Sequence, residues 1–167
     1  MPVTVQISSR YAEVFATPLP ADPAKAAVIS GFRQSQVLWD KSSVALHLVG
    51  TTTEYVTGNA LTTLNKVLRS FSQKNLVPVG TDRMFDTKIT SLTADSATVT
   101  TCDDGSRYNT ADRTSGQTPA PVPVSQQYVF AIFGMSRVGG RWANSSVSAI
   151  TYPDPRVKAC IQETENS

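Results

Sequence analysis

The hydrophobic period of this chain changes once, near Pro78, and the change divides the sequence into a helical part and a sheet part. Before Pro78 the apolar residues recur every three to four positions, which keeps one face of a helix apolar. After Pro78 apolar and polar residues alternate, as they do in half-buried strands. Helices followed by an antiparallel meander predict an α+β fold.

The helical part predicts two helices. The first begins at Pro23 with Asp22 as its N-cap, because proline at the first helical position has no N–H to leave unsatisfied. Its apolar face extends to about Leu48. The second carries an apolar stripe over residues 61–71 and is expected to end near Asn75.

The sheet part predicts about four strands, over residues 84–92, 96–102, 126–138 and 140–152. A turn at Thr93–Asp95 joins the first two, and Gly139–Gly140 is a strong hairpin signal between the last two. The third strand is apolar on both faces, which predicts a central strand that is covered on both sides. Residues 109–124 are rich in Thr, Pro and Ser and predict a long exposed loop.

A length of 167 residues suits one domain. Residues 22–161 are expected to form it, with a C-terminal tail over 162–167. Residues 1–21 are interpreted as an N-terminal extension or linker that contains one short strand, "VTVQIS". If the extension is ordered, we expect it to add an edge strand to a sheet, because unpaired backbone needs partners.

Composition bears on partners and compartment. The net charge of +2 is spread along the chain without a basic stripe, so nucleic-acid binding has little support. No apolar run approaches the ~20 residues of a membrane helix. The first residues do not form a signal peptide. The protein is therefore either cytoplasmic or an exported protein whose leader is not in this sequence, and its low charged content of 17% is common among exported proteins.

Cys102, in "TTCDDGSRY", has three interpretations. A nucleophile needs a nearby base, and the only histidine, His47, lies at the end of the first predicted helix. A metal site would use Asp103 and Asp104, but two carboxylates are few for Ca²⁺, and "DDG" is also ordinary turn chemistry. The third interpretation is a disulfide.

The position of Cys160, the other cysteine, favours the disulfide. It lies in a tail after the last strand that has little apolar content to hold it. A bridge to Cys102 would tie this tail to the sheet and is worth roughly 4 kcal/mol in the chain-entropy model. Such a bridge indicates an oxidising compartment.

Five blocks of the chain together resemble a known family: "LPADPAKAAVISGFRQSQVLWDKSS", "YVTGNALTTLNKVL", "VGTDRMFDTKITSLTADSATVTTCDDGSRY", "GGRWANSSVSAI" and "PDPRVKAC". They are similar to secreted proteins and lipoproteins of actinobacteria. The resemblance implies a nuclear transport factor 2-like, cystatin-like domain, in which a curved sheet wraps around helices as a cone. It also implies an extracellular location or one on the outer face of the membrane, and it leaves open a lipid anchor upstream of Met1. It implies no activity and no cofactor.

Cones of this class have a pocket between the first helix and the concave face of the sheet, where enzymes place an acid or a histidine as general base. Asp40 is the weak candidate for that base. The candidate pocket residues are Phe32, Trp39, Tyr128, Phe130 and Trp142, although packing in the core is the favoured explanation of these side chains. Asn144 begins a glycosylation sequon, but within a predicted strand.

Two functions of different class follow. The first is a non-catalytic accessory or binding domain at the cell surface, which holds a protein of the cell envelope or a small apolar ligand, as a monomer or a homodimer. The second is a small isomerase- or cyclase-like enzyme with Asp40 as the base. A closed cavity filled by Trp39, Phe32 and Phe130 would favour the first, and an open pocket with a buried acid of raised pKa the second.

Overall fold

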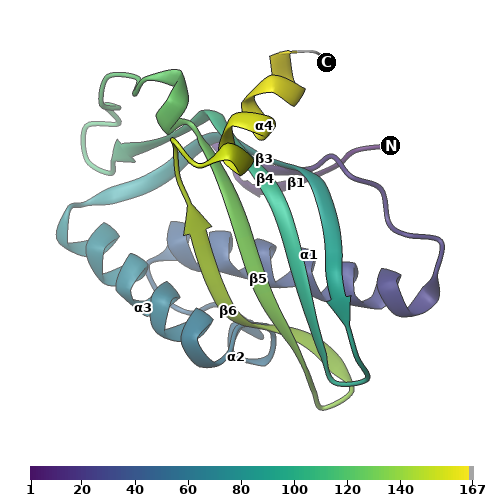
Figure 1. The fold of residues 1–167 in the computed structure, drawn as a ribbon. Helices are drawn as coiled ribbons and strands as arrows, with labels where there is room; N and C mark the ends of the chain where they lie inside the picture. Colours follow the sequence, from purple (N-terminus) through teal and green to yellow (C-terminus); the bar gives the residue numbers. More distant parts are fainter. Residues whose placement is uncertain (166–167) are drawn as a thin grey trace.

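The structure is a computed structural model, and it describes residues 1–165. Figure 1 shows a curved sheet with helices packed on both of its faces. The helices are α1 (Pro23–Ala45), α2 (Thr52–Tyr55), α3 (Gly58–Gln73) and α4 (Pro155–Glu165), with a 3₁₀ turn, η1, at Val124–Gln126. The strands are β1 (Val3–Ser8), β2 (Tyr11–Phe15), β3 (Leu76–Leu92), β4 (Ser96–Asp112), β5 (Tyr128–Val138) and β6 (Arg141–Ile150).

The fold class is α+β, as predicted, but the sheet has six strands rather than about four. The strands follow chain order across the sheet, from β1 to β6. The two additional strands come from residues 1–21. β1 is an edge strand of the sheet, as expected of an ordered extension, and β2, which was not predicted, joins it to β3. Neighbouring strands are antiparallel except β2 and β3, which are parallel because α1, α2 and α3 connect them.

The helical signals place α1 as predicted. Asp22 caps the helix by accepting a hydrogen bond from the Lys25 N–H at 2.8 Å, and Pro23 is the first helical residue. The helix ends at Ala45, and the next residue, Leu46, has a left-handed φ of 62°. Gly31 permits close packing on the sheet, since a Cβ there would lie 2.6 Å from the Cβ of Trp142.

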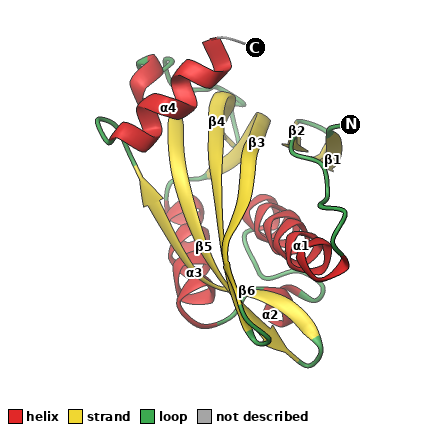
Figure 2. Ribbon diagram, turned by 45° about the vertical axis from the view of Figure 1, so that its right-hand side comes forward, coloured by secondary structure: helices red, strands yellow, loops and turns green. Residues whose placement is uncertain are grey.

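The sheet bends around α1 because its long central strands are irregular. The β3–β4 ladder shifts register between Thr81 and Arg83, between Phe85 and Lys88, and again between Ile89 and Ser91. Such register shifts arise where one strand has an extra residue, as in a β-bulge, and they bend the strand and increase its twist. Figure 2 shows α1 and α3 together on the concave face of the bent sheet. The main core lies between α1 and the sheet, where Phe32 is fully buried against Phe133, with ring centroids 4.9 Å apart.

The last helix shows that the helices are not all N-terminal. The tail after β6, in which no helix was predicted, forms α4 on the convex face of the sheet. Val157 and Cys160 are the buried residues of this helix. The tail interpreted as residues 162–167 is helical to Glu165, and residues 166–167 lie outside the described part of the chain.

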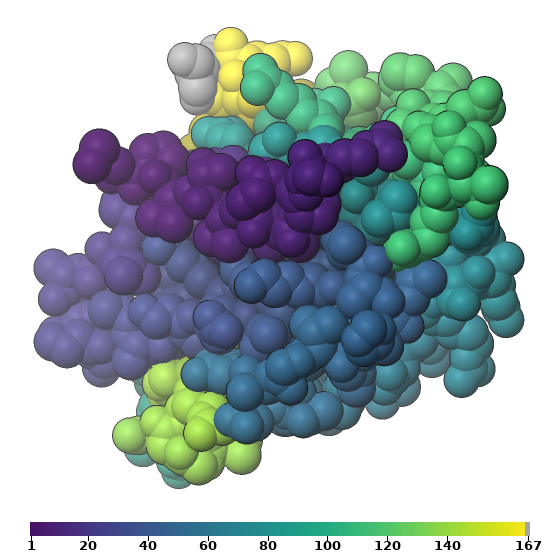
Figure 3. All heavy atoms as spheres, turned by 180° about the vertical axis from the view of Figure 1, so that it is seen from behind, coloured from purple at the N-terminus to yellow at the C-terminus, as the bar shows by residue number. Residues whose placement is uncertain are grey.

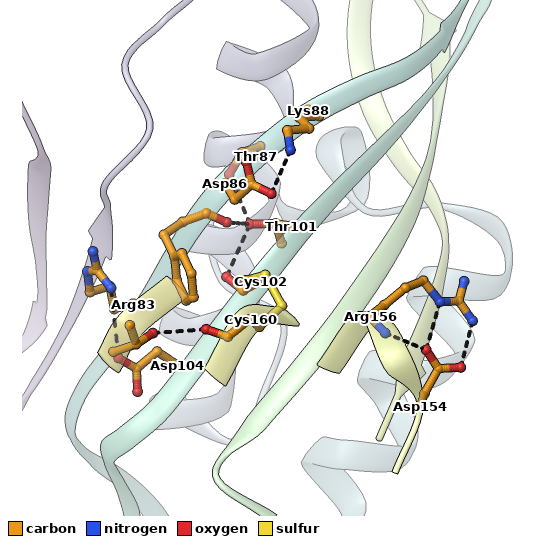
Figure 4. The surroundings of a disulfide bond; sticks show 12 residues. Arg83, Asp86, Thr87, Lys88, Thr101, Cys102, Asp104, Asp154, Arg156 and Cys160 are labelled. Carbon is orange, nitrogen blue, oxygen red and sulfur yellow. Dashed lines mark hydrogen bonds and ion pairs between the residues drawn. A yellow bond between two sulfur atoms is a disulfide. The ribbon is translucent and has the colours of Figure 1, made fainter. Parts of the chain in front are cut away.

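The predicted disulfide is present. Cys160 of α4 is bonded to Cys102 of β4, 58 positions away in sequence, with a Cα–Cα distance of 5.7 Å (Figure 4). The bridge is packed among Phe85, Tyr128 and Val157 in a second apolar cluster. Both cysteines are almost fully buried, so the bridge is part of the core on the convex face.

The N-terminal segment lies across the back of the molecule, alongside α1 (Figure 3). The predicted loop over 109–124 is shorter than expected, because β4 continues to Asp112. Arg113 then donates hydrogen bonds to the Leu76 carbonyl of β3 and to the Val44 carbonyl at the end of α1. None of the helices in residues 1–165 has the length and apolar character needed to cross a membrane.

Candidate functional site

A cavity of about 510 Å³ lies between α1 and the concave face of the sheet. One face of α1 supplies Gln36, Trp39, Asp40 and Ser43, at the three- and four-residue spacing that puts side chains on the same side of a helix. The opposite wall is apolar and comes from β5 and β6: Val129, Ala131, Phe133, Val147 and Ala149. The alternation of strand residues explains why these odd-numbered positions share one face.

Four carboxyl groups gather on the polar side of this cavity. They come from four elements: Glu13 of β2, Asp40 of α1, Asp82 of β3 and Asp103 of β4. Glu13 and Asp82 are direct partners in the parallel β2–β3 ladder. The three aspartates line the cavity, and Glu13 lies behind them with no exposed surface.

Two tyrosines lie beside the carboxyls. Tyr11 of β2 donates a hydrogen bond to Asp40. The rings of Tyr11 and Tyr108 meet edge to face, with centroids 5.8 Å apart. Burial and the neighbouring carboxylates raise the pKa of both phenols above their ordinary value, so both remain hydrogen-bond donors at neutral pH.

Glu13 and Asp40 form a carboxyl pair that shares a proton. Neither Glu13 oxygen has a hydrogen-bond donor when both acids are ionised, which would be costly for a fully buried group. Burial, with the charges of Asp40 and Asp82, raises the pKa of Glu13 well above its ordinary value, so Glu13 keeps its proton and donates a hydrogen bond to Asp40. Burial raises the pKa of Asp40 to about 7, against the opposing effect of the hydrogen bonds from Glu13 and Tyr11.

Asp82 and Asp103 form a second pair of the same kind. Burial, with the charge of Asp82, raises the pKa of Asp103 well above its ordinary value, so Asp103 holds the proton. Burial raises the pKa of Asp82 to about 6, while the hydrogen bond from Asp103 opposes the rise. Like-charged acids in close contact cannot all ionise, and sharing protons is the usual result. The site thus contains donors and acceptors side by side at neutral pH.

The structure divides the pocket residues expected from sequence between the two faces of the sheet. Asp40 and Trp39 line the cavity. Phe32 and Trp142 belong to the core beneath it. Tyr128 and Phe130 project from the other face of β5 into the cluster around the disulfide. His47 is exposed, and its ring is hydrogen bonded to the Ala45 carbonyl at 3.0 Å.

Asp103 and Asp104, considered together as a cation site, point in opposite directions. Asp103 faces the cavity, whereas Asp104 accepts a hydrogen bond from the Ser106 N–H and lies 3.9 Å from Arg83 (Figure 4). Across residues 1–165 no three or more His, Cys, Asp or Glu side chains are arranged to hold a metal ion.

Sequence reasoning missed Glu13, Asp82, Tyr11 and Tyr108. A signal for Glu13 exists: in "YAEVF" the glutamate shares the inward face with Tyr11 and Phe15, and an acid on the buried face of a strand is unusual. Interpreting residues 1–21 as an extension removed that signal from consideration. The residues around Asp82 in the sequence give no signal for a site, because Asp82 lies beside Glu13 only through the pairing of β2 with β3.

Comparison with known proteins places the fold but not the activity. No protein-family model matches the chain, and neither does any curated protein. Among solved structures, the intermembrane space region of the chloroplast protein ARC6 is similar with a TM-score of 0.53 and 14% identity, over 79% of this chain and 99% of that one. A second similar structure comes from Xanthomonas campestris and is described provisionally as a calcium/calmodulin-dependent protein kinase II association domain. Its TM-score is 0.51 and its identity 12%, over 90% of this chain and 99% of that one.

A third structure is less similar. It is an NTF2-like protein with a cystatin-like fold from Novosphingobium aromaticivorans, with a TM-score of 0.43 and 8% identity, over 85% of this chain and 98% of that one. At such identities the likeness concerns backbone architecture alone, and function has to be argued from the cavity.

Proposed function

We propose that the cavity is an acid–base active site that moves a proton on a small, largely apolar ligand, in the manner of an isomerase or cyclase. The observation that carries this proposal is the position of Asp40. It lies at the wall of an open cavity, in contact with a proton donor on each side, Glu13 and Tyr11. A general base works best with a pKa near the operating pH, and the pKa of Asp40 is raised to about 7.

Each group has a role in such a reaction. Asp40 accepts a proton from a carbon next to a carbonyl group, and the electron pair of the broken C–H bond moves to the carbonyl oxygen. Tyr108, which holds its proton and lines the cavity, donates a hydrogen bond to that oxygen. Asp40 then returns the proton to another position of the same ligand. The apolar wall of β5 and β6 holds the ligand body and limits access of water.

The proposal includes an oxidising compartment, outside the cell or on the outer face of its membrane. The buried disulfide between Cys102 and Cys160 supports that location, since such bridges persist where thiols are not kept reduced. An origin in the actinobacterial secreted family and a lipid anchor remain part of the proposal.

Exchange of carbon-bound hydrogen tests the proton transfer without knowledge of the natural ligand. We expect the protein to accelerate deuterium incorporation into 2-tetralone or cyclohexanone in D2O, measured by NMR, with a rate that rises through about pH 7 as Asp40 ionises. Asp40→Asn should lower the rate by about 10²-fold or more. Asp104→Asn is the matched control, because Asp104 lies on the other side of the sheet and its amide oxygen would keep the Ser106 contact. An Asp40→Asn rate equal to that of wild type would refute the role of Asp40.

The second candidate is a non-catalytic binding domain, and the predominantly apolar wall favours it. A ketone that binds in the cavity, detected by chemical-shift changes of Trp39 and Ala131, but shows no accelerated exchange would support that function instead.

A further inference from the structure

The acidic side chains of the cavity are not paired with a basic side chain of the described residues that line it. The two oxygens of Glu13 and one oxygen of Asp82 are buried and have no hydrogen-bond partner outside the carboxyl cluster. None of the side chains that line the cavity is Lys, Arg or His. Three aspartates, with Glu13 buried behind them, thus line a water-accessible space that no Lys, Arg or His of the described residues lines.

The nearby arginines are engaged elsewhere. Arg83 pairs with Asp104 and lies over the ring of Phe85, on the other face of the sheet. Arg33 donates to the Thr17 carbonyl, and Arg113 binds backbone carbonyls at the end of α1. A chain that places its own cations away from a carboxyl cluster leaves the cluster free for a cation from outside.

We propose that the ligand of this cavity is an amphiphilic organic cation, a protonated primary or secondary amine carried on an apolar body. The ammonium group would lie among Asp40, Asp82 and Asp103, where its N–H donors replace the shared protons. The rings of Tyr11 and Tyr108 lie beside the carboxyl groups, and Trp39 lines the same cavity, so aromatic faces add their attraction for a cation. The body would lie along the apolar residues of β5 and β6.

The volume supports a small ligand of this shape. About 510 Å³ is within the range of ligand pockets in proteins, and burial of an apolar body is the main source of affinity at such sites. A cation at one end and an apolar wall at the other define the orientation of the ligand. This inference uses the same cavity as the proposed function, but it concerns the charge of the ligand and does not depend on the reaction.

Three probes of matched shape test the charge preference: 2-phenylethylamine, its neutral analogue 2-phenylethanol, and the anion 3-phenylpropionate. We expect calorimetry at pH 7.5 and low salt to show binding of the amine, with the alcohol at least tenfold weaker and the carboxylate not detectable. The amine should bind more weakly at high salt, because screening weakens the attraction between charges. Equal affinity for the amine and the alcohol would overturn the inference, as would absence of amine binding.

The pH dependence gives a second readout. The titratable groups that line the ammonium position are Tyr11 from β2, Asp40 from α1, Asp82 from β3, and Asp103 and Tyr108 from β4, and Glu13 of β2 lies buried behind them. Because the carboxyls lose protons as the pH rises, amine affinity should increase from pH 5.5 to 7.5 while the amine stays protonated. Affinity that is constant or falls over this range would contradict the inference.

Variants separate this inference from the proposed reaction. Asp82→Asn should weaken amine binding at least tenfold, and Asp104→Asn, which removes a charge paired with Arg83 outside the cavity, should change it less than about twofold. Far-ultraviolet circular dichroism and the unfolding midpoint establish that each variant is folded. Ketone exchange without selective amine binding would leave the acid–base function standing and remove the cationic ligand. Selective amine binding without ketone exchange would support the cationic ligand and refute the acid–base function.

Discussion

Gly80 lies between the two tyrosines of the cavity. In the sheet it is the partner of Tyr11 on one side and of Tyr108 on the other, so the two rings meet across a residue without a side chain. Its φ of +92° is disfavoured for any other residue, and a Cβ there would lie 2.0 Å from the Arg107 carbonyl oxygen. One glycine thus sets the spacing of both phenols.

Gly80→Ala should therefore be strongly destabilising. We expect a loss of at least about 3 kcal/mol in the free energy of unfolding, from overpacking combined with a left-handed backbone, measured by urea titration. Gly139→Ala is the matched control, because Gly139 also has a positive φ, of 56°, but nothing within 4 Å of the added Cβ. It should lose only about 1–2 kcal/mol. Similar losses in the two variants would show that the close approach at Gly80 does not matter.

At the scale of elements, α4 depends on the convex face of the sheet. Its apolar contacts are few, with Val157 and Cys160 buried and Ile161 partly buried. Arg156 at its start is paired with Asp154, an exposed pair of the kind that contributes little to stability (Figure 4). The disulfide is consequently the main attachment of this helix to β4.

Replacing both cysteines by serine should release α4 first. Loss of a bridge that closes a loop of this length costs about 4 kcal/mol in the chain-entropy model. Amide exchange should accelerate most over residues 155–165 and least in β4, measured by hydrogen exchange with mass spectrometry. Uniform acceleration across the sheet would mean that the bridge supports the whole core, and unchanged exchange in α4 would mean that Val157 and Ile161 hold the helix alone.

For the whole molecule, the carboxyl cluster couples stability to pH. In the unfolded chain these acids ionise near pH 4, whereas in the folded protein the pKa of Asp40 is about 7 and that of Asp82 about 6. Between these values the folded state binds more protons than the unfolded state. Its stability must then fall as the pH rises from about 4 to 7.

We expect the thermal unfolding midpoint to be several degrees higher at pH 5 than at pH 8, measured by calorimetry at constant ionic strength. Glu13→Gln should flatten this dependence, because the amide keeps a donor for Asp40 and removes one titrating group. A midpoint that rises from pH 5 to pH 8 would show that the cluster does not hold its protons in the folded state. Asp86→Asn, outside the cavity, serves as the control for a change in net charge.

Local signals in the sequence determined much of the fold. The N-cap at Asp22, the hairpin at Gly139–Gly140 and the alternation after Pro78 each act over a few residues, so they can be interpreted without knowledge of distant contacts. The pairing of Cys102 with Cys160 also followed from the sequence, because only two cysteines exist and one lies near the chain end.

The tertiary structure alone decided the site. Asp40 could be suspected from its place on the first helix, but Glu13, Asp82 and Asp103 are separated by up to 90 positions and meet only because β2, β3 and β4 are neighbours. The parallel pairing of β2 with β3 depends on three intervening helices, which no local pattern specifies. Which strand face points into the cavity, and hence whether Tyr128 or Val129 lines it, is likewise set by register and not by residue type.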